Sequence, residues 1–167
     1  MPTSAVPLRG TLTSTSPAAT RAIGHALGDV ATPGTLIALI GPLGAGKTQL
    51  TKGLAEGLGV TSMVNSPTFV LMNEHVGRLR LFHVDAYRLD DPEDLLAVGL
   101  LDDRAADGVT VVEWADRLAG WLPDERLEID LQPGTADEAT RSLRWQAIGT
   151  EHHRLAELAL APLGPRP

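Results

Sequence analysis

The residues best suited to chemistry in this sequence form one glycine-rich run, Gly41–Thr48 (GPLGAGKT). The run matches the pattern G-x-x-x-x-G-K-[ST], in which glycines let backbone amides approach a phosphate closely. In that pattern Lys47 places its ammonium group on the β- and γ-phosphates of a nucleotide, and the Thr48 hydroxyl binds Mg²⁺. We therefore predict phosphate binding; the alternative is a glycine-rich turn without a special role. The residues predicted to hold the phosphates are Leu43, Gly44, Ala45, Gly46, Lys47 and Thr48.

The segments on either side of this run favour phosphate binding. Thr35–Ile40 is apolar without alternation, which is typical of a strand buried on both faces. A helix is predicted from Lys47 to about Leu58. A helix that begins at the loop adds unpaired N–H groups and the positive end of its dipole, and both attract anions.

Two carboxylates that follow apolar strands are candidates for the metal side of the site. Asp85 ends the run Leu81–Val84, and Glu113 ends the run Val109–Val112. A P-loop protein needs such a carboxylate at the end of a neighbouring strand. Glu113 is interpreted as the magnesium-side carboxylate and a water activator. Asp85 is interpreted as a second metal or γ-phosphate-side group, and the sequence leaves open which of the two polarises the attacking water.

Other polar and aromatic residues support several interpretations. Ser66-Pro67-Thr68 lies where many P-loop proteins have switch I, so Thr68 is predicted to sense the γ-phosphate; the alternative is a turn that starts a strand. Trp114 either stacks on a partner or a moving loop, or belongs to the core. His83 is interpreted as structural, and His152 and His153 as a solvated face of the last helix.

The rest of the pattern predicts a single domain over residues 11–161. Residues 1–10 are predicted to be a poorly ordered tail, and residues 162–167 a frayed C-terminus. The fold expected is a P-loop NTPase-like, three-layer α/β/α fold whose mixed central sheet combines a parallel core with antiparallel hairpin strands. The further elements predicted are a helix Pro17–Val30, a hairpin of Phe69–His75 with Arg78–Val84, a helix starting at Asp91, antiparallel strands Arg126–Leu131 and Arg141–Ile148, and a helix Glu151–Leu160 capped by Thr150.

Composition excludes several classes of protein. The 167 residues include no cysteine, which excludes disulfide scaffolds and thiolate zinc sites. The formal net charge of −7 argues against direct binding to DNA, RNA or an anionic membrane surface. No run approaches the roughly 18 apolar residues of a membrane span. Met1–Gly10 lacks the basic segment followed by an apolar segment that is typical of a secretory signal. We therefore expect a cytoplasmic protein.

Missing motifs narrow the choice of nucleotide and reaction. Guanine recognition uses an Asn-Lys-x-Asp element, and Lys52 is the one lysine outside the loop, so ATP is favoured over GTP. No cluster of arginines forms a lid, and the chain leaves little room for a second substrate site. This favours an ATPase with a conformational output delivered to a partner. The alternatives are a P-loop kinase of a small metabolite and a non-hydrolysing, nucleotide-dependent binding module.

Four motifs together resemble the bacterial TsaE (YjeE) family. They are the loop Gly41–Thr48, Ser66-Pro67-Thr68-Phe69, the run His83–Leu89 (HVDAYRL) and the run Val112–Asp116 (VEWAD). The resemblance covers about residues 11–160. The sequence departs from the family pattern at Pro42, at Ala86 and at Ala115-Asp116, and these departures leave the acidic positions intact.

The resemblance implies a small Mg²⁺-dependent ATPase that serves the threonylcarbamoyladenosine (t6A) modification of tRNAs reading ANN codons. It implies association with the TsaB–TsaD pair, which ATP hydrolysis resets between turnovers, with tRNA contacted only through these partners. It carries over Lys47 and Thr48 as phosphate and magnesium residues, and Asp85 and Glu113 as the acidic pair with Glu113 on the metal. It also implies roles for Ser66, Pro67 and Thr68 as switch residues, for Trp114 as the family tryptophan, and for Arg141 near the nucleotide.

Overall fold

The computed structural model describes residues 6–65, 72–89, 91, 93, 106–118 and 120–165. Three predicted switch residues, Ser66, Pro67 and Thr68, lie outside the described residues. So does most of the helix predicted to start at Asp91.

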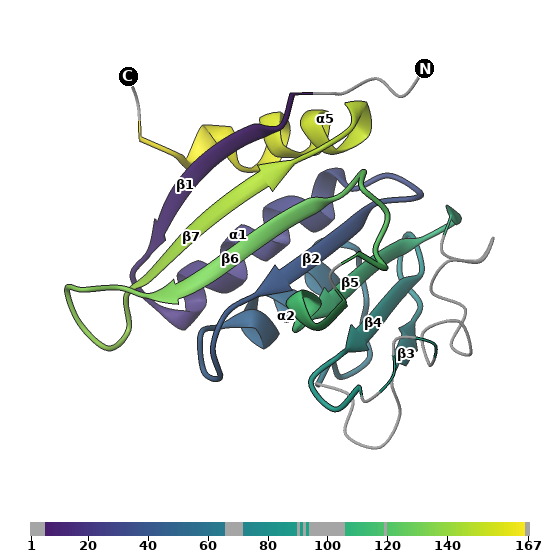
Figure 1. The fold of residues 1–167 in the computed structure, drawn as a ribbon, viewed down its shortest axis with the longest axis horizontal. Coiled ribbons are helices and arrows are strands. Elements are labelled where there is room, and N and C mark those ends of the chain that lie inside the picture. The colour runs from purple at the N-terminus through teal and green to yellow at the C-terminus, as the bar shows by residue number, and fades with distance from the viewer. Residues whose placement is uncertain are drawn as a thin grey trace.

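A mixed sheet of seven strands forms the centre of the described structure, in the order β1-β7-β6-β2-β5-β4-β3 (Figure 1). Strands β6, β2, β5 and β4 run parallel to their neighbours in this series, whereas β1, β7 and β3 are joined to the sheet by antiparallel pairing. The predicted α/β class, with a parallel core and antiparallel hairpin strands, is therefore confirmed. The strands are β1 (Leu8–Ser14), β2 (Leu36–Ile40), β3 (Met72–His75), β4 (Leu81–Asp85), β5 (Val109–Glu113), β6 (Leu127–Pro133) and β7 (Arg141–Ala147).

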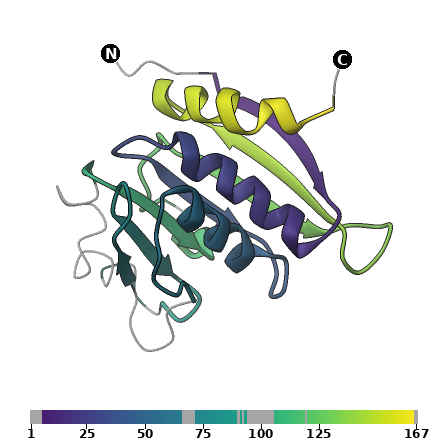
Figure 2. The same ribbon diagram turned by 180° about the vertical axis from the view of Figure 1, so that it is seen from behind.

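The described α-helices cover one face of the sheet, as the view from behind shows (Figure 2). They are α1 (Pro17–Val30), α2 (Lys47–Gly57) and α5 (Thr150–Ala159), and a short 3₁₀ helix, η2 (Ala161–Leu163), follows α5. A second 3₁₀ helix, η1 (Ala115–Leu118), lies on the opposite face (Figure 1). None of the described helices is long and apolar enough to cross a membrane.

Strand β2 shows why the sequence before the loop has no alternation. Ile37 and Leu39 face the core beneath α1 and α2, whereas Leu36 and Ala38 face a second core that includes Leu118 of η1. Because both faces of β2 are covered, both sets of side chains are apolar. This burial fixes the strand end from which the loop Gly41–Thr48 begins.

Several predicted boundaries and pairings are wrong in detail. Strand β1 begins at Leu8, inside the predicted tail, because Gly10 pairs with Trp145 and leaves room for its ring. Strand β6 is antiparallel only to β7 and runs parallel to β2. Its alternation arises because Leu127, Ile129 and Leu131 are buried while the residues between them are half-buried. Helix α5 has Gly149, not Thr150, at its N-cap, and residues 161–163 continue in a 3₁₀ turn.

Helix α1 begins as predicted. Ser16 caps it by accepting a hydrogen bond from the N–H of Ala19 at 3.0 Å, and Pro17 occupies the first turn. Ala18 and Ala22 are exposed, whereas Ala26 is half-buried against the core. The buried residues of α1 are Thr20, Ile23, Gly24, Leu27 and Gly28.

Glycines bring α1 and α2 into direct backbone contact. A Cβ atom added to Gly24 or Gly28 of α1 would overlap the carbonyl oxygens of Leu50 or Leu54 in α2. A Cβ atom added to Gly53 or Gly57 of α2 would overlap the carbonyl oxygens of Arg21 or His25 in α1. We call these four residues the glycine seam. The seam leaves the two helices little freedom to slide, because backbone atoms meet on both sides.

The seam predicts an inverted effect for a substitution that normally stabilises helices. At an exposed helix position, alanine stabilises a helix by about 1 kcal/mol relative to glycine. Ala22→Gly should therefore lower the free energy of unfolding by about this amount. In the seam, Gly53→Ala should instead lower the free energy of unfolding by about 1–3 kcal/mol through overpacking. Urea unfolding of both variants measures this difference, and a more stable Gly53→Ala protein would contradict the seam.

His152 is buried, against the prediction of a solvated face. It is 5% exposed, and its Nε2 accepts a hydrogen bond from the N–H of Leu36 at 3.1 Å. Because Nε2 accepts, the ring in this contact is the neutral form. Burial lowers the pKa of His152, with Glu125 and Glu151 opposing the shift.

This contact predicts a loss of stability in mild acid. The unfolded chain takes up the proton near pH 6.5 while the folded chain resists it, so stability falls as the pH drops below about 6.5, by at most about 1.4 kcal/mol per pH unit for one proton. His152→Gln should reduce the slope measured by urea unfolding between pH 7.5 and 5.5. His75, whose pKa burial also lowers, leaves a residual slope. The exposed His25→Gln is the control, and an unchanged slope in His152→Gln would refute this account.

Candidate functional site

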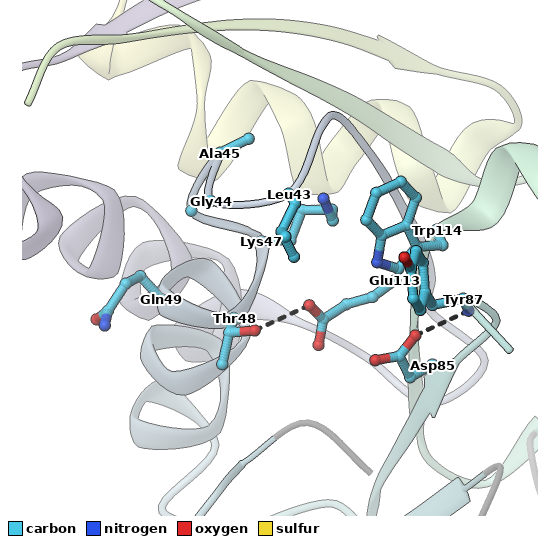
Figure 3. A pocket seen from close by; sticks show the side chains of 11 residues that line it. Leu43, Gly44, Ala45, Lys47, Thr48, Gln49, Asp85, Tyr87, Glu113 and Trp114 are labelled. Atoms are coloured by element: carbon cyan, nitrogen blue, oxygen red, sulfur yellow. Dashed lines mark hydrogen bonds between the residues drawn. The ribbon is translucent and has the colours of Figure 1, made fainter. Parts of the chain in front are cut away.

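A cavity of about 370 Å³ lies where the loop Gly41–Thr48 meets the carboxyl ends of β4 and β5 (Figure 3). The structure brings together here every described residue predicted for the site except Arg141, which contacts the loop from another side. The cavity is also lined by Gln49 and Tyr87, which the sequence did not single out. Its lining residues are Leu43, Gly44, Ala45, Gly46, Lys47, Thr48, Gln49, Asp85, Tyr87, Glu113 and Trp114.

The loop is shaped for an anion. Gly44 and Gly46 adopt φ values of 78° and 105°, a left-handed conformation that other residues adopt only with strain. Gly46 is the N-cap of α2, and no described side chain caps the helix there. Gly46, Lys47 and Thr48 at the start of α2 line the cavity, and the helix dipole favours a negative group there.

Lys47 lies at the mouth of the loop and is only 5% exposed. Its Nζ donates hydrogen bonds to the carbonyl oxygens of Gly41 at 2.5 Å and Pro42 at 2.8 Å. The same ammonium lies 4.0 Å from the centroid of the Trp114 ring. Burial lowers the pKa of Lys47, while the charges of Glu113, Asp116 and Asp85 oppose that shift. The ammonium thus has neutral partners that phosphate oxygens can replace.

Glu113 joins the loop to the sheet. The Thr48 hydroxyl donates to Glu113 Oε1 at 3.0 Å, and the carboxylate is buried, at 2% exposure. The predicted hydroxyl and carboxylate therefore lie side by side, although α2 and β5 are distant in the sequence. Figure 3 shows Lys47, Thr48 and Glu113 facing the same space.

Asp85 is the neighbour of Glu113 in the register of the parallel strands β4 and β5. Its Oδ1 accepts a hydrogen bond from the N–H of Tyr87 at 2.9 Å. Burial raises the pKa of Asp85, and the nearby charge of Glu113 raises it further. The hydrogen bond from Tyr87 opposes this shift. Asp85 is consequently a more basic carboxylate than an exposed aspartate.

Trp114 lines the cavity and packs against the edge of the core. It has φ 59°, the one positive value of a described residue other than glycine. Its half-buried ring lies 4.8 Å from that of Tyr87 between centroids. The left-handed backbone, unfavourable for a bulky residue, brings the ring back over Lys47 directly after Glu113.

His83 is a site residue that sequence reasoning assigned only to structure. Its Nε2 forms a hydrogen bond with Glu113 Oε2, and the ring is fully buried. The signal that points to it is its spacing, since His83 and Asp85 lie two residues apart in a strand and therefore share one face.

Arg141 reaches the loop from β7. Its guanidinium donates to the carbonyl oxygens of Gly44 at 3.1 Å and Thr140 at 3.0 Å. The preceding turn is held by Asp137, whose pKa is lowered by hydrogen bonds from Thr140 and Ala139. A second cavity of about 110 Å³ opens beside this contact, lined by Pro17, Thr20, Gly44, Gly46, Gln49, Ala139 and Arg141.

The donor set decides which metal the site can take. The described residues contain no cluster of three or more histidine, aspartate or glutamate side chains able to hold an ion by themselves. Thr48 and Glu113 supply a hydroxyl and one carboxylate, and Mg²⁺ is commonly bound by one or two such groups together with substrate phosphates and waters. The residues present therefore fit Mg²⁺ arriving with a nucleotide.

The strand, glycine loop and helix, with carboxylates at neighbouring strand ends, define an α/β protein of the P-loop class. Residues 14–143 match the family model "Threonylcarbamoyl adenosine biosynthesis protein TsaE". The chain belongs to the TsaE family.

Named relatives and a solved structure agree with this assignment. The tRNA threonylcarbamoyladenosine biosynthesis protein TsaE of Bacillus subtilis (strain 168) is 43% identical over 143 residues, covering 85% of this chain and 88% of that protein. The Mycobacterium tuberculosis (strain CDC 1551 / Oshkosh) protein of the same name is 40% identical over 135 residues, covering 75% and 80%. The crystal structure of Bacillus subtilis YdiB matches with a TM-score of 0.78 at 35% identity, covering 92% of this chain and 95% of that chain.

The contact between Arg141 and Gly44 predicts a local effect on the loop. Arg141→Ala should speed amide hydrogen exchange in residues 42–48 because the loop loses its tie to β7. The global free energy of unfolding should change by no more than about 0.5 kcal/mol, as for most surface substitutions. The control is Arg144→Ala, since Arg144 lies on the same strand but pairs with Asp130. Equal exchange in the two variants would show that Arg141 does not hold the loop.

Proposed function

We propose that this chain binds ATP with Mg²⁺ in the cavity of about 370 Å³ and hydrolyses it in the service of t6A biosynthesis. The observation that carries the proposal is the 3.0 Å contact between Thr48 and Glu113 beside the buried ammonium of Lys47. A hydroxyl, a carboxylate and an ammonium at the start of an uncapped helix are the groups that binding a nucleotide phosphate with Mg²⁺ requires.

Each group has a role that follows from its surroundings. The loop amides and Lys47 bind and orient the phosphates, with Lys47 exchanging its bonds to Gly41 and Pro42 for phosphate oxygens. Thr48 and Glu113 hold Mg²⁺, which when bound neutralises charge that develops on the phosphates. Arg141 keeps the loop in place through Gly44.

Asp85 is our choice for the carboxylate that accepts a proton from the attacking water. Glu113 is engaged through both oxygens, by Thr48 and by His83. Asp85 faces the same cavity, and burial raises its pKa toward that of a better base. This division of labour is our proposal for the choice that the sequence left open.

The proposed output is conformational and is delivered to the TsaB–TsaD pair, which the resemblance to the TsaE family suggests as partner. Apolar side chains at the mouth of the cavity support a partner contact there: Leu43 is 84% exposed and Tyr87 is 45% exposed. The net charge of −7 supports holding tRNA through the partners rather than directly. We therefore expect slow hydrolysis by the isolated chain and faster hydrolysis in the complex.

The test compares the two lysines of the chain, both on α2. Lys47→Ala should reduce phosphate release from ATP by about 100-fold or more, in line with the loss of one charge-stabilising group. Lys52→Ala, outside this cavity, should leave phosphate release unchanged. Phosphate release with and without TsaB–TsaD is the measurement, together with t6A levels in cells that carry each variant.

Each alternative function gives a different result in this experiment. A phosphorylated acceptor in place of free phosphate would indicate a metabolite kinase. ATP binding without phosphate release, even in the full complex, would indicate a binding module. Normal t6A levels in the Lys47→Ala strain would contradict the proposed role in the pathway.

A further inference from the structure

We propose that His83 is a positioning residue that orients the Glu113 carboxylate so that Oε1 faces Thr48 and the Mg²⁺ position. The inference deepens the proposed function and rests on it, because the orientation matters only if Thr48 and Glu113 hold the metal. It assigns a role to a side chain outside the lining of the cavity of about 370 Å³.

The geometry begins with the two oxygens of Glu113. Oε1 accepts the hydroxyl hydrogen of Thr48 at 3.0 Å, and Oε2 is bonded to His83 Nε2. One oxygen thus points to the loop and the other to the sheet. A carboxylate bonded at both ends cannot rotate about its terminal torsion without breaking a contact, although that torsion is otherwise broad.

Strand pairing explains why His83 is within reach. In the parallel pair of β4 and β5, Val111 is the partner of His83, and Glu113 lies two residues beyond Val111. Residues two apart share one face of a strand. His83 and Glu113 therefore lie on the same face of adjacent strands, the face covered by α2.

Burial makes the contact consequential. His83 is 0% exposed and Glu113 is 2% exposed, so the hydrogen bond between Nε2 and Oε2 lies inside the protein. An ionised carboxylate only accepts, so Nε2 must carry the hydrogen. Without His83, Oε2 would be a buried acceptor lacking this donor, which favours rotation of the carboxylate away from Thr48.

A neighbouring histidine provides a matched control. His75 is also buried, at 9% exposure, and lies on the adjacent antiparallel strand β3, where its partner is Leu81. Its Nδ1 is hydrogen-bonded to Ser62 Oγ at 2.8 Å rather than to Glu113. Replacing His75 therefore removes a buried imidazole from the neighbouring strand without removing the contact to the carboxylate.

Two amide substitutions at position 83 separate the hydrogen bond from the ring. The glutamine amide nitrogen can occupy the place of Nε2, whereas the asparagine amide is one carbon shorter and cannot reach Glu113. His83→Asn should lower the apparent Mg²⁺ affinity in nucleotide binding by about 10–100-fold, the usual effect of losing a group that orients a metal ligand. His83→Gln and His75→Gln should stay close to wild type, and ADP binding without Mg²⁺ should not change in any of the three.

A second readout needs no nucleotide. Nitrogen-15 NMR of the free protein should show a slowly exchanging N–H on Nε2 of His83, and this signal should be lost or shifted in Glu113→Gln. Thermal unfolding of every variant shows which ones fold. If His83→Asn does not fold, the NMR signal of the wild type and its response to Glu113→Gln decide the question.

Three results would overturn the inference while leaving the proposed function in place. The first is wild-type Mg²⁺ affinity in His83→Asn, and the second is an equal loss of Mg²⁺ affinity in His75→Gln. The third is an N–H signal of His83 that does not change in Glu113→Gln. If the wild-type protein bound no nucleotide with Mg²⁺, the proposed function and this inference would both fail. The NMR signal would then still report the contact between His83 and Glu113 as a purely structural one.

Discussion

The backbone contact between α1 and α2 is the constraint on which the site depends. Four glycines let the helices meet without side chains between them, so α2 is fixed along its axis by carbonyl groups of α1 on both sides of the crossing. Position along that axis matters because Lys47 and Thr48 are the first two residues of α2. A shift of even one ångström would separate Thr48 from Glu113, whose place is set independently by the sheet. Helix packing far from the cavity thus sets the distance that the chemistry needs.

The sheet contributes the second half of this arrangement by placing two carboxylates in different surroundings. Asp85 and Glu113 are partners in the register of adjacent parallel strands, so both reach the same end of the sheet. Glu113 has a hydroxyl and an imidazole as partners, whereas Asp85 has one backbone N–H, and burial raises its pKa. Pairs of acidic groups whose environments differ in this way are suited to different roles in one reaction. The strand register brings the two carboxylates close together, and their different hydrogen-bond partners make their surroundings differ.

How far the sequence predicts this site depends on how local each feature is. The loop, its helix and the strand before it are adjacent in the chain, so motif and flanking pattern were enough to predict them. Asp85 and Glu113 were predicted because apolar strands with polar ends are also local signals. The contact of His83 with Glu113 requires strand order and register, which no local pattern gives. The same is true of the parallel pairing of β6 with β2, and of the glycine seam, where each helix alone shows only two unfavourable glycines.

Trp114 connects this geometry to the proposed dependence on a partner. A bulky residue at φ 59° costs of order 1–3 kcal/mol of backbone strain, and here the surrounding contacts hold it there. Its ring lies against Lys47 on one side and Tyr87 on another, and Tyr87 is itself exposed to solvent. A phosphate that draws Lys47 away from Gly41 and Pro42 would also remove the cation from the face of the indole. Occupancy of the loop would then alter a surface aromatic cluster, which is the change that a partner bound at the mouth can detect. The same three side chains would therefore link phosphate binding to recognition, in keeping with the proposal that hydrolysis is slow until the partner is present.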